Sequence, residues 1–272
     1  MYITNRPEIA VIAENAGVDR IFVDMEFIGK SARQGGMNTV QCRHTLEDIA
    51  AIRKTISKAE LLVRCNPIHN ATTEYTDSQD EIDGIIENGA DIIMLPYFKT
   101  PDEVRRFVSY VGGRTRTMLL VETPEAVERI DKILDIEGID EVHIGLNDLS
   151  LGYSKKFMFE LLTDGTVEKL CFKCRQKGLI YGFGGIASLG KGLLPAERII
   201  KEHYRLGSTC AILSRSFCNT SADTEVDTVR SVFADGIKEI RDFEKECEYY
   251  AKYFNDNMTE ITHAVQQIVE RG

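Results

Sequence analysis

The sequence has no long apolar run and no excess of positive charge. No stretch approaches the roughly 18 consecutive apolar residues that predict a transmembrane helix. The first 17 residues do not place a basic segment before an apolar one, as a secretory signal does. The formal net charge of −10 argues against nucleic acid and anionic membranes as partners. We therefore expect a cytoplasmic protein.

Two common cofactor motifs are also missing. No GxGxxG follows the first predicted strand, which removes the main signal for a dinucleotide-binding fold. Cys171 and Cys174 form the only CxxC, whereas a zinc knuckle needs a second pair. These two cysteines lie in a helical pattern, so we expect them one turn apart on a helix. The odd total of seven cysteines indicates free thiols in a reducing compartment.

What the chain does contain is a regular alternation of short apolar strands and amphipathic helices. Its 272 residues are enough for one large domain. Strands are predicted at 2–4, 20–25, 60–64, 91–95, 116–121, 139–144, 179–184 and 209–213. Helices are predicted at 7–17, 45–57, 79–88, 101–110, 124–134, 166–177 and 195–206. Eight strands, nearly all followed by a helix, predict a (β/α)8 TIM barrel over residues 1–220.

A charged, amphipathic segment continues beyond the eighth strand. Residues 221–272 carry apolar side chains at helical spacing, among them Val229, Phe233 and Ile240. We expect a helical extension that packs either on its own barrel or on a neighbouring subunit. The second alternative would make the protein a homo-oligomer.

Charged residues close several of the predicted strands. Glu122 and Asp148 follow two consecutive strands, and Arg64 closes an earlier one. In a parallel barrel the carboxyl ends of the strands converge on one face, so these side chains should meet there. Two carboxylates can hold a divalent cation, and an arginine beside them can stabilise an oxyanion. The alternative is that the two acidic residues only cap helices.

Five segments together resemble the HpcH/HpaI aldolase and citrate lyase family of metal-dependent, pyruvate-handling enzymes. They are GVDRIFVDME (17–26), LLVRCNP (61–67), GADIIMLPYFKTPDEVRRFV (89–108), LLVETPEAVERID (119–131) and VHIGLNDLSLGY (142–153). The resemblance covers roughly residues 5–213. It implies a barrel of the pyruvate/phosphoenolpyruvate type that acts on a small-molecule 2-oxo acid and an aldehyde.

The resemblance also implies roles for individual residues. Glu122 and Asp148 would bind a divalent metal ion, either Mg²⁺ or Mn²⁺ and conceivably Co²⁺. Arg64 would stabilise the pyruvate enolate. Backbone N–H groups near Gly145, Asn147 and Asp148 would hold the pyruvate carboxylate.

The sequence departs from the family pattern at two positions. Phe27 stands where family aldolases carry the histidine that acts as general base, and Leu120 replaces a glutamine. His69 or His44 could supply the base from a loop, although each is also explained as a solvated loop residue. Metal-bound water could serve instead. A third alternative is a reaction that needs no such base, as in decarboxylation of a β-keto acid such as oxaloacetate.

Other charged residues are further candidates for the same face. Lys30 and Arg33, in a polar segment after the second strand, could hold a distal carboxylate or phosphate, or lie in an ordinary solvated loop. Ser214 and Arg215 follow the eighth strand and, with the glycines of 182–192, could bind an anion or serve only tight turns. Asp24 and Glu26 close the second strand, where a catalytic or a purely structural hydrogen bond is equally expected.

The function predicted from these residues is a divalent-metal-dependent carbon–carbon lyase of the aldolase type. Three alternatives remain open: a lyase like citrate lyase or a malyl-CoA lyase, an oxaloacetate-type decarboxylase, and a catalytically silent protein that binds a 2-oxo acid.

Overall fold

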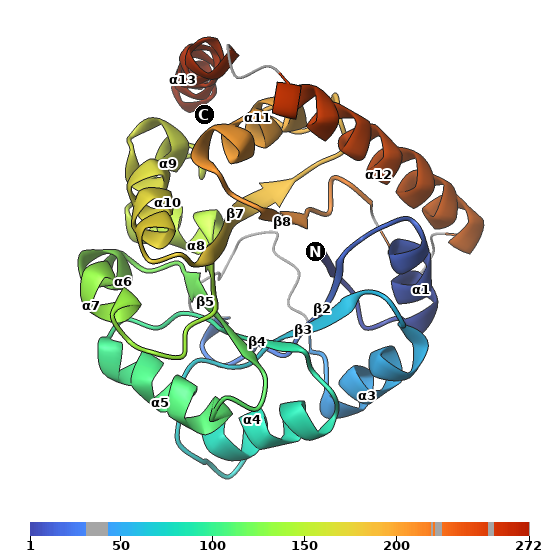
Figure 1. The fold of residues 1–272 in the computed structure, drawn as a ribbon, viewed down its shortest axis with the longest axis vertical. Coiled ribbons are helices and arrows are strands. Elements are labelled where there is room, and N and C mark those ends of the chain that lie inside the picture. The colour runs from blue at the N-terminus through green and yellow to red at the C-terminus, as the bar shows by residue number, and fades with distance from the viewer. Residues whose placement is uncertain (31–42, 219, 221–224, 250–252, 272) are drawn as a thin grey trace.

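Eight short parallel strands form a nearly closed barrel at the centre of the molecule (Figure 1). The computed structural model describes residues 1–30, 43–218, 220, 225–249 and 253–271. The strands are β1 (Tyr2–Ile3), β2 (Arg20–Asp24), β3 (Glu60–Arg64), β4 (Ile92–Leu95), β5 (Arg116–Val121), β6 (Glu141–Ile144), β7 (Ile180–Ile186) and β8 (Cys210–Leu213). They follow one another in sequence order around the sheet. Closure comes at Met1, whose carbonyl accepts from Leu213 N (2.8 Å) and whose amino group donates to Ala211 O (2.9 Å).

Helices surround the barrel, so the predicted (β/α)8 architecture is confirmed. They are α1 (Pro7–Asn15), α3 (Leu46–Thr55), α4 (Ser78–Glu87), α5 (Pro101–Val111), α6 (Pro124–Glu128), α7 (Ile130–Leu134), α8 (Leu146–Gly152), α9 (Glu160–Thr163), α10 (Thr166–Gln176), α11 (Ala196–Leu206), α12 (Val226–Tyr249) and α13 (Phe254–Arg271). The helix predicted at 124–134 is two helices that meet at Arg129. The short helices α8 and α9 were not predicted, because neither spans enough residues to show a helical period.

Local signals in the sequence explain where several helices begin. Thr100 and Thr123 each precede a proline at the first helical position. Their side chains accept from Glu103 N and Ala126 N, respectively, which satisfies N–H groups that have no partner inside the helix. Helix α6 therefore starts immediately after Glu122, and this fixes where the carboxylate leaves strand β5.

Side chains fill the interior of the barrel in three layers, because every second residue of a strand points inwards. Its middle layer is apolar and contains Phe22, Leu62, Met94, Met118 and Leu120. The alternate residues of the same strands face outwards and form the larger core between the sheet and the helices. Along each strand, the side chains two residues before and after the apolar layer also point inwards.

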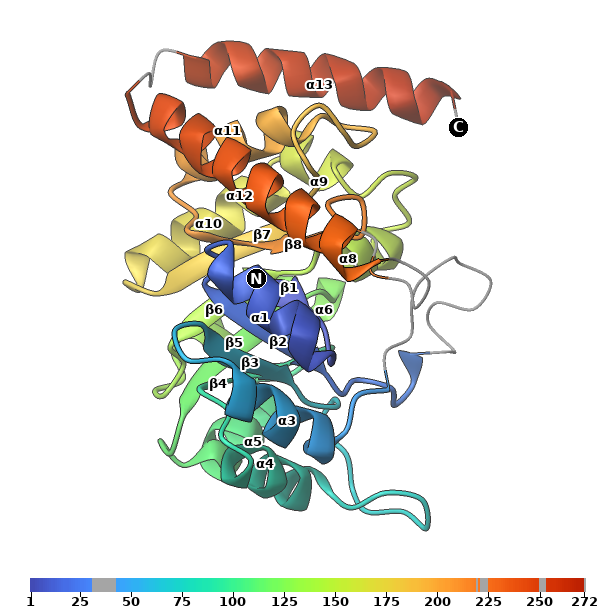
Figure 2. The same ribbon diagram turned by 90° about the vertical axis from the view of Figure 1, so that its right-hand side faces the viewer.

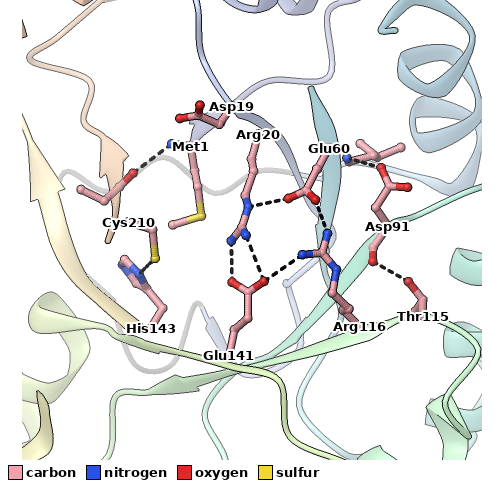
Figure 3. A network of polar contacts seen from close by, with 12 residues as sticks. Met1, Asp19, Arg20, Glu60, Asp91, Thr115, Arg116, Glu141, His143 and Cys210 are labelled. Atoms are coloured by element: carbon pink, nitrogen blue, oxygen red, sulfur yellow. Dashed lines mark hydrogen bonds and ion pairs between the residues drawn. The ribbon is translucent and has the colours of Figure 1, made fainter. Parts of the chain in front are cut away.

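Four charged side chains fill the layer at the amino ends of the strands (Figure 3). Arg20 forms two hydrogen bonds to Glu141, of 2.6 and 2.9 Å, and one to Glu60, of 2.9 Å. Arg116 bridges the same two carboxylates. Glu141 is almost fully buried, so its charge is stabilised by these two arginines rather than by water.

The C-terminal helices lie outside the barrel, as the side view shows (Figure 2). Helix α12 packs on α1 and α11, and α13 packs on α11 and α9. Buried side chains of α12 and α13, among them Val229, Phe233 and Ile261, join the outer core. The predicted extension is thus two helices rather than one, and the domain boundary at residue 220 stays a prediction.

The described cysteines are all free thiols. Cys171 and Cys174 lie buried on α10, as their helical pattern predicted. No helix within the described residues is long and apolar enough to span a membrane.

The charged layer at the amino ends of the strands should be needed for stability. We expect Glu141→Gln to lower the free energy of unfolding by about 3 kcal/mol, because it leaves two arginines facing a neutral amide. Glu128→Gln is the matched control, since Glu128 is exposed and its pairing with Arg129 at 3.7 Å is worth less than about 1 kcal/mol. Urea unfolding followed by circular dichroism measures both. Equal values for the two variants would contradict the structural role of the layer.

Candidate active site

A cavity of about 640 Å³ opens at the carboxyl ends of the strands, at the opposite end of the barrel from the four-charge layer. Its wall includes Asp24, Glu26, Lys30, His44, Arg64, Glu122, His143, Gly145, Asn147, Asp148, Ser214 and Arg215. The structure therefore brings together the three residues that the strand ends predicted, Arg64, Glu122 and Asp148. A second cavity of about 530 Å³ shares Glu122 and Asp148 with the first.

Glu122 is a buried carboxylate whose charge is poorly compensated. Its position, two residues after Leu120, continues the inward-facing series of β5. Burial raises the pKa of Glu122 to about 8; repulsion from Glu26 and Asp148 adds to the rise, and Arg64 opposes it. Without a further cation, this side chain is protonated at neutral pH.

A strained backbone holds Glu122 in place. Tyr97 adopts φ of 49°, a left-handed conformation that is unfavourable for a residue with a side chain. In this conformation the Tyr97 N–H donates to Glu122 Oε1 at 2.9 Å. The sequence gives no signal for this contact, because the residue after Pro96 has no pattern that predicts a positive φ.

Asp148 reaches the cavity from the first turn of α8. The Asn147 side-chain amide donates to Asp148 Oδ1 at 3.1 Å. Leu146, Asn147 and Asp148 all line the cavity, and the first N–H groups of a helix have no intrahelical partner. They are therefore suited to bind a carboxylate.

Gly145 contributes in a different way from the one predicted. Its own N–H donates to Val121 O at 3.0 Å and is not available to a substrate. A Cβ at this position would lie 2.9 Å from Glu122 Oε2 and 2.9 Å from Glu122 Cβ. The missing side chain thus lets the Glu122 side chain pack directly against the backbone of residue 145.

Arg64 is held by a bidentate ion pair. Its Nε and Nη2 donate to the two oxygens of Asp24, at 2.8 and 2.7 Å, and its Nη1 lies 3.4 Å from Glu26 Oε2. The guanidinium also lies 5.5 Å from the centre of the Phe22 ring. Since arginine carries five N–H bonds, these contacts leave donors on Nη1 and Nη2 for a ligand.

Lys30 lies inside the site instead of in a solvated loop. It is only 5% exposed, and its Nζ lies 3.2 Å from Asp24 Oδ2 and 3.3 Å from Glu26 Oε2. Burial by itself would raise the pKa of Asp24, but Arg64 and then Lys30 outweigh that effect and hold the pKa below its ordinary value. Lys30 thus pairs with two carboxylates of the protein, and its role toward a distal group of the substrate stays a prediction.

The histidines differ in their access to the cavity. His69 is not among the lining residues, since its Nδ1 and Nε2 lie 2.8 and 3.0 Å from the carbonyls of Pro67 and Thr76. His143 does line the cavity but donates from Nε2 to Gly184 O at 3.1 Å, and burial lowers its pKa to about 4. His44 also lines the cavity. Phe27 is 43% exposed and contacts Tyr75 outside the cavity.

The remaining candidates lie at the rim or outside the described residues. Ser214 and the exposed Arg215 form part of the cavity wall after β8, together with Gly184 and Gly185 of β7. Arg33 falls in 31–42, which the structure does not describe. Within the described ranges, no group of three or more His, Cys, Asp and Glu side chains is arranged to hold a metal ion. The pair Glu122 and Asp148 as metal ligands stays a prediction.

Comparisons with known proteins agree with this geometry. A model of the HpcH/HpaI aldolase/citrate lyase family matches residues 2–183. A hydroxypyruvate/pyruvate aldolase of Sagittula stellata is 31% identical in a match that covers 27% of this chain. The match spans 41% of that relative, less than half of its length.

Solved structures share the fold at low identity. An HpcH/HpaI aldolase from Desulfitobacterium hafniense DCB-2 superposes with a TM-score of 0.58 at 18% identity, covering 88% of this chain and 91% of that one. An HpcH/HpaI aldolase/citrate lyase family protein from Burkholderia cenocepacia J2315 superposes with a TM-score of 0.60 at 15% identity, covering 89% of this chain and 94% of that one. The citrate synthase SbnG superposes with a TM-score of 0.57 at 16% identity, covering 89% of this chain and 92% of that one. The family match over residues 2–183, on a barrel with charged strand ends, shows that the chain belongs to the HpcH/HpaI aldolase/citrate lyase family.

Proposed function

We propose that this protein is a divalent-metal-dependent carbon–carbon lyase that cleaves or forms a 2-oxo acid through a pyruvate enolate. The observation that carries the proposal is the buried Glu122 carboxylate, placed beside Asp148 and Arg64 in one cavity. Membership of an aldolase and lyase family supports the general class. The name of the Sagittula relative supports pyruvate as one substrate.

The charges around Glu122 favour a divalent cation. Asp24 and Glu26 are paired with Arg64 and Lys30, so these four charges balance one another. Arg64 also lowers the pKa of Glu122, but burial and repulsion from Glu26 and Asp148 outweigh this effect and raise the pKa to about 8. A bound divalent ion would remove the repulsion that keeps Glu122 protonated.

The residues present fit such an ion. Both ligands are carboxylates, the hard oxygen donors that Mg²⁺, Mn²⁺ and Co²⁺ accept. Glu122 Oε1 is fixed by the Tyr97 N–H, and the carboxylate can pack against residue 145 because that residue has no Cβ. When bound, the ion would supply Lewis-acid stabilisation of negative charge on the substrate oxygens.

The chain itself would bind and orient the 2-oxo acid. The remaining N–H donors of Arg64 would hydrogen-bond the enolate oxygen, where charge develops during carbon–carbon cleavage. Asp24 and Glu26 keep the guanidinium in one orientation, so this stabilisation needs no rearrangement. The N–H groups at Leu146 and Asn147 would bind the carboxylate.

Decarboxylation of a β-keto acid is the second candidate function, and the histidines favour it. His69 faces backbone carbonyls, and His143 Nε2 donates to Gly184. Phe27 occupies the position of the family's base. Loss of carbon dioxide passes through the same enolate but needs no base to begin, so oxaloacetate is a substrate to compare directly with the aldol reactions.

The enolate can be detected before the second substrate is known. We expect the protein to exchange the methyl protons of pyruvate in D₂O when Mg²⁺ or Mn²⁺ is present and to stop when EDTA is added. Arg64→Lys should slow the exchange on the order of 100-fold, because a lysine cannot reproduce the bidentate pair or the planar donors. Proton NMR follows the loss of the methyl signal.

Glu137→Gln is the control for this experiment, because Glu137 is exposed and lines neither the 640 Å³ cavity nor the 530 Å³ cavity. Circular dichroism checks that each variant is folded. Exchange that continues unchanged in EDTA would contradict the metal requirement. Absence of exchange together with metal-dependent loss of carbon dioxide from oxaloacetate would favour the decarboxylase.

Metal binding should depend on pH through Glu122. Since its pKa is raised to about 8, the ion must displace a proton below that pH. We expect the affinity for Mn²⁺ to increase about tenfold between pH 6.5 and 7.5 and to level off above pH 8. Calorimetry in two buffers with different ionisation enthalpies should detect close to one released proton at pH 7.

Two variants sharpen the pH measurement. Glu122→Gln should bind Mn²⁺ weakly and without this pH dependence, whereas Glu137→Gln should behave like the unmodified protein. An affinity that is independent of pH from 6.5 to 8.5 would show that Glu122 is not a ligand that loses a proton.

A further inference from the structure

His44 lies against the end of β2 and has a role that the family resemblance does not assign. It enters the cavity from the segment immediately before α3 and lines the same wall as Asp24 and Lys30. The backbone N–H of Asp24 lies 2.9 Å from His44 Nδ1. This contact ties the imidazole to the strand that also carries the partner of Arg64.

The contact determines which nitrogen carries the proton. A backbone amide can only donate, so His44 Nδ1 must accept and is unprotonated. Burial lowers the pKa of His44, although Asp24 and Asp48 oppose the shift, and the ring is therefore neutral near pH 7. In a neutral imidazole with an unprotonated Nδ1, the proton lies on Nε2.

The ring that carries this Nε2–H group lines the cavity. Over the described ranges, Asp24 N is the hydrogen-bond partner recorded for the ring, and none is recorded for Nε2. His44 itself is part of the cavity wall.

His44 stands across the barrel from the two carboxylates. Glu122 and Asp148 follow β5 and β6, whereas His44 rests on β2, and β3 and β4 separate these strands in the sheet. A pyruvate unit held by Glu122, Asp148 and Arg64 would extend its reactive carbon toward the rest of the cavity. The second substrate would then lie on the side of His44.

We propose that His44 donates a hydrogen bond from Nε2 to the carbonyl oxygen of the acceptor that the pyruvate enolate attacks. This inference rests on the proposed function, because it requires an enolate in the same cavity. The ring polarises the carbonyl without transferring a proton, since a further proton could enter only at Nδ1, which the Asp24 N–H occupies. His44 is accordingly an acceptor-binding residue and is excluded as the general base.

Two substitutions separate this role from a structural one. His44→Asn places an amide oxygen close to the position of Nδ1, so it keeps the acceptor for the Asp24 N–H but removes the distal donor. His44→Gln extends further and returns an N–H near the position of Nε2. A purely structural histidine would tolerate asparagine, whereas a donor to the substrate would tolerate glutamine better.

The variants are compared in two reactions. Methyl exchange of pyruvate reports enolate formation alone. Addition of pyruvate to glyoxylate, glycolaldehyde and glyceraldehyde, followed by NMR, reports attack on the acceptor. We expect His44→Asn to reduce kcat/KM for the addition about 10- to 100-fold and to change exchange less than about twofold. His44→Gln should recover part of the loss.

Each other outcome would overturn the proposal. Unchanged addition in His44→Asn, or equal losses of exchange and addition, would mean that His44 does not contact the acceptor. A protein that exchanges the methyl protons but joins none of the three carbonyls would also contradict it. Absence of exchange in the unmodified protein would instead refute the proposed function.

The tautomer gives an independent test that needs no substrate. Long-range ¹H–¹⁵N correlation spectra distinguish Nε2–H from Nδ1–H imidazoles, and the signals that His44→Asn removes identify this ring. We expect the Nε2–H form at pH 7.5. The Nδ1–H form or a protonated ring would overturn the assignment whether or not the protein proves to be a lyase.

Discussion

The two-residue period of the parallel strands is the constraint on which the rest of the structure depends. Because alternate side chains face inwards, Arg20, Phe22 and Asp24 form one column in the barrel, and Arg116, Met118, Leu120 and Glu122 form another. Each column has a charge at both ends and apolar atoms between them. The apolar layer separates a closed ion-pair layer from an open one, so the same strands provide stability at one end and chemistry at the other.

The two charged ends differ in how completely they are neutralised. At the amino ends, two arginines and two glutamates contact one another directly. At the carboxyl ends, Arg64 and Lys30 neutralise Asp24 and Glu26 but leave Glu122 with a raised pKa. Arg64 is central to this second arrangement, since it pairs with Asp24 and also lowers the free energy of an ionised Glu122. Under the proposed function, a divalent cation would stabilise the ionised form of Glu122 at this end.

Much of the fold was readable from the sequence, because strand and helix periods are local properties. All eight strands were predicted within two residues at each end, and Thr100 and Thr123 marked helix starts through their own side chains. The convergence of Arg64, Glu122 and Asp148 followed from the strand ends alone.

Other parts of the site depend on contacts between distant segments and have no local signature. The burial of Lys30 results from carboxylates on β2, and the left-handed Tyr97 is maintained by its hydrogen bond to Glu122 on the next strand. The Asp24 N–H that fixes the His44 tautomer lies 20 residues away in the chain. A sequence shows which residues can carry a charge, but it does not show which of these charges form ion pairs with one another in the folded protein.

Gly145 illustrates how a position can be restricted by its neighbour rather than by its own backbone. Its φ of −83° and ψ of 92° are accessible to every amino acid, so an alanine there would fold without local strain. The added methyl group would nevertheless occupy the space beside the Glu122 carboxylate. An alanine at position 145 would therefore have to displace the buried Glu122 side chain, so a residue whose own backbone is unrestricted is still limited to glycine by the strand beside it.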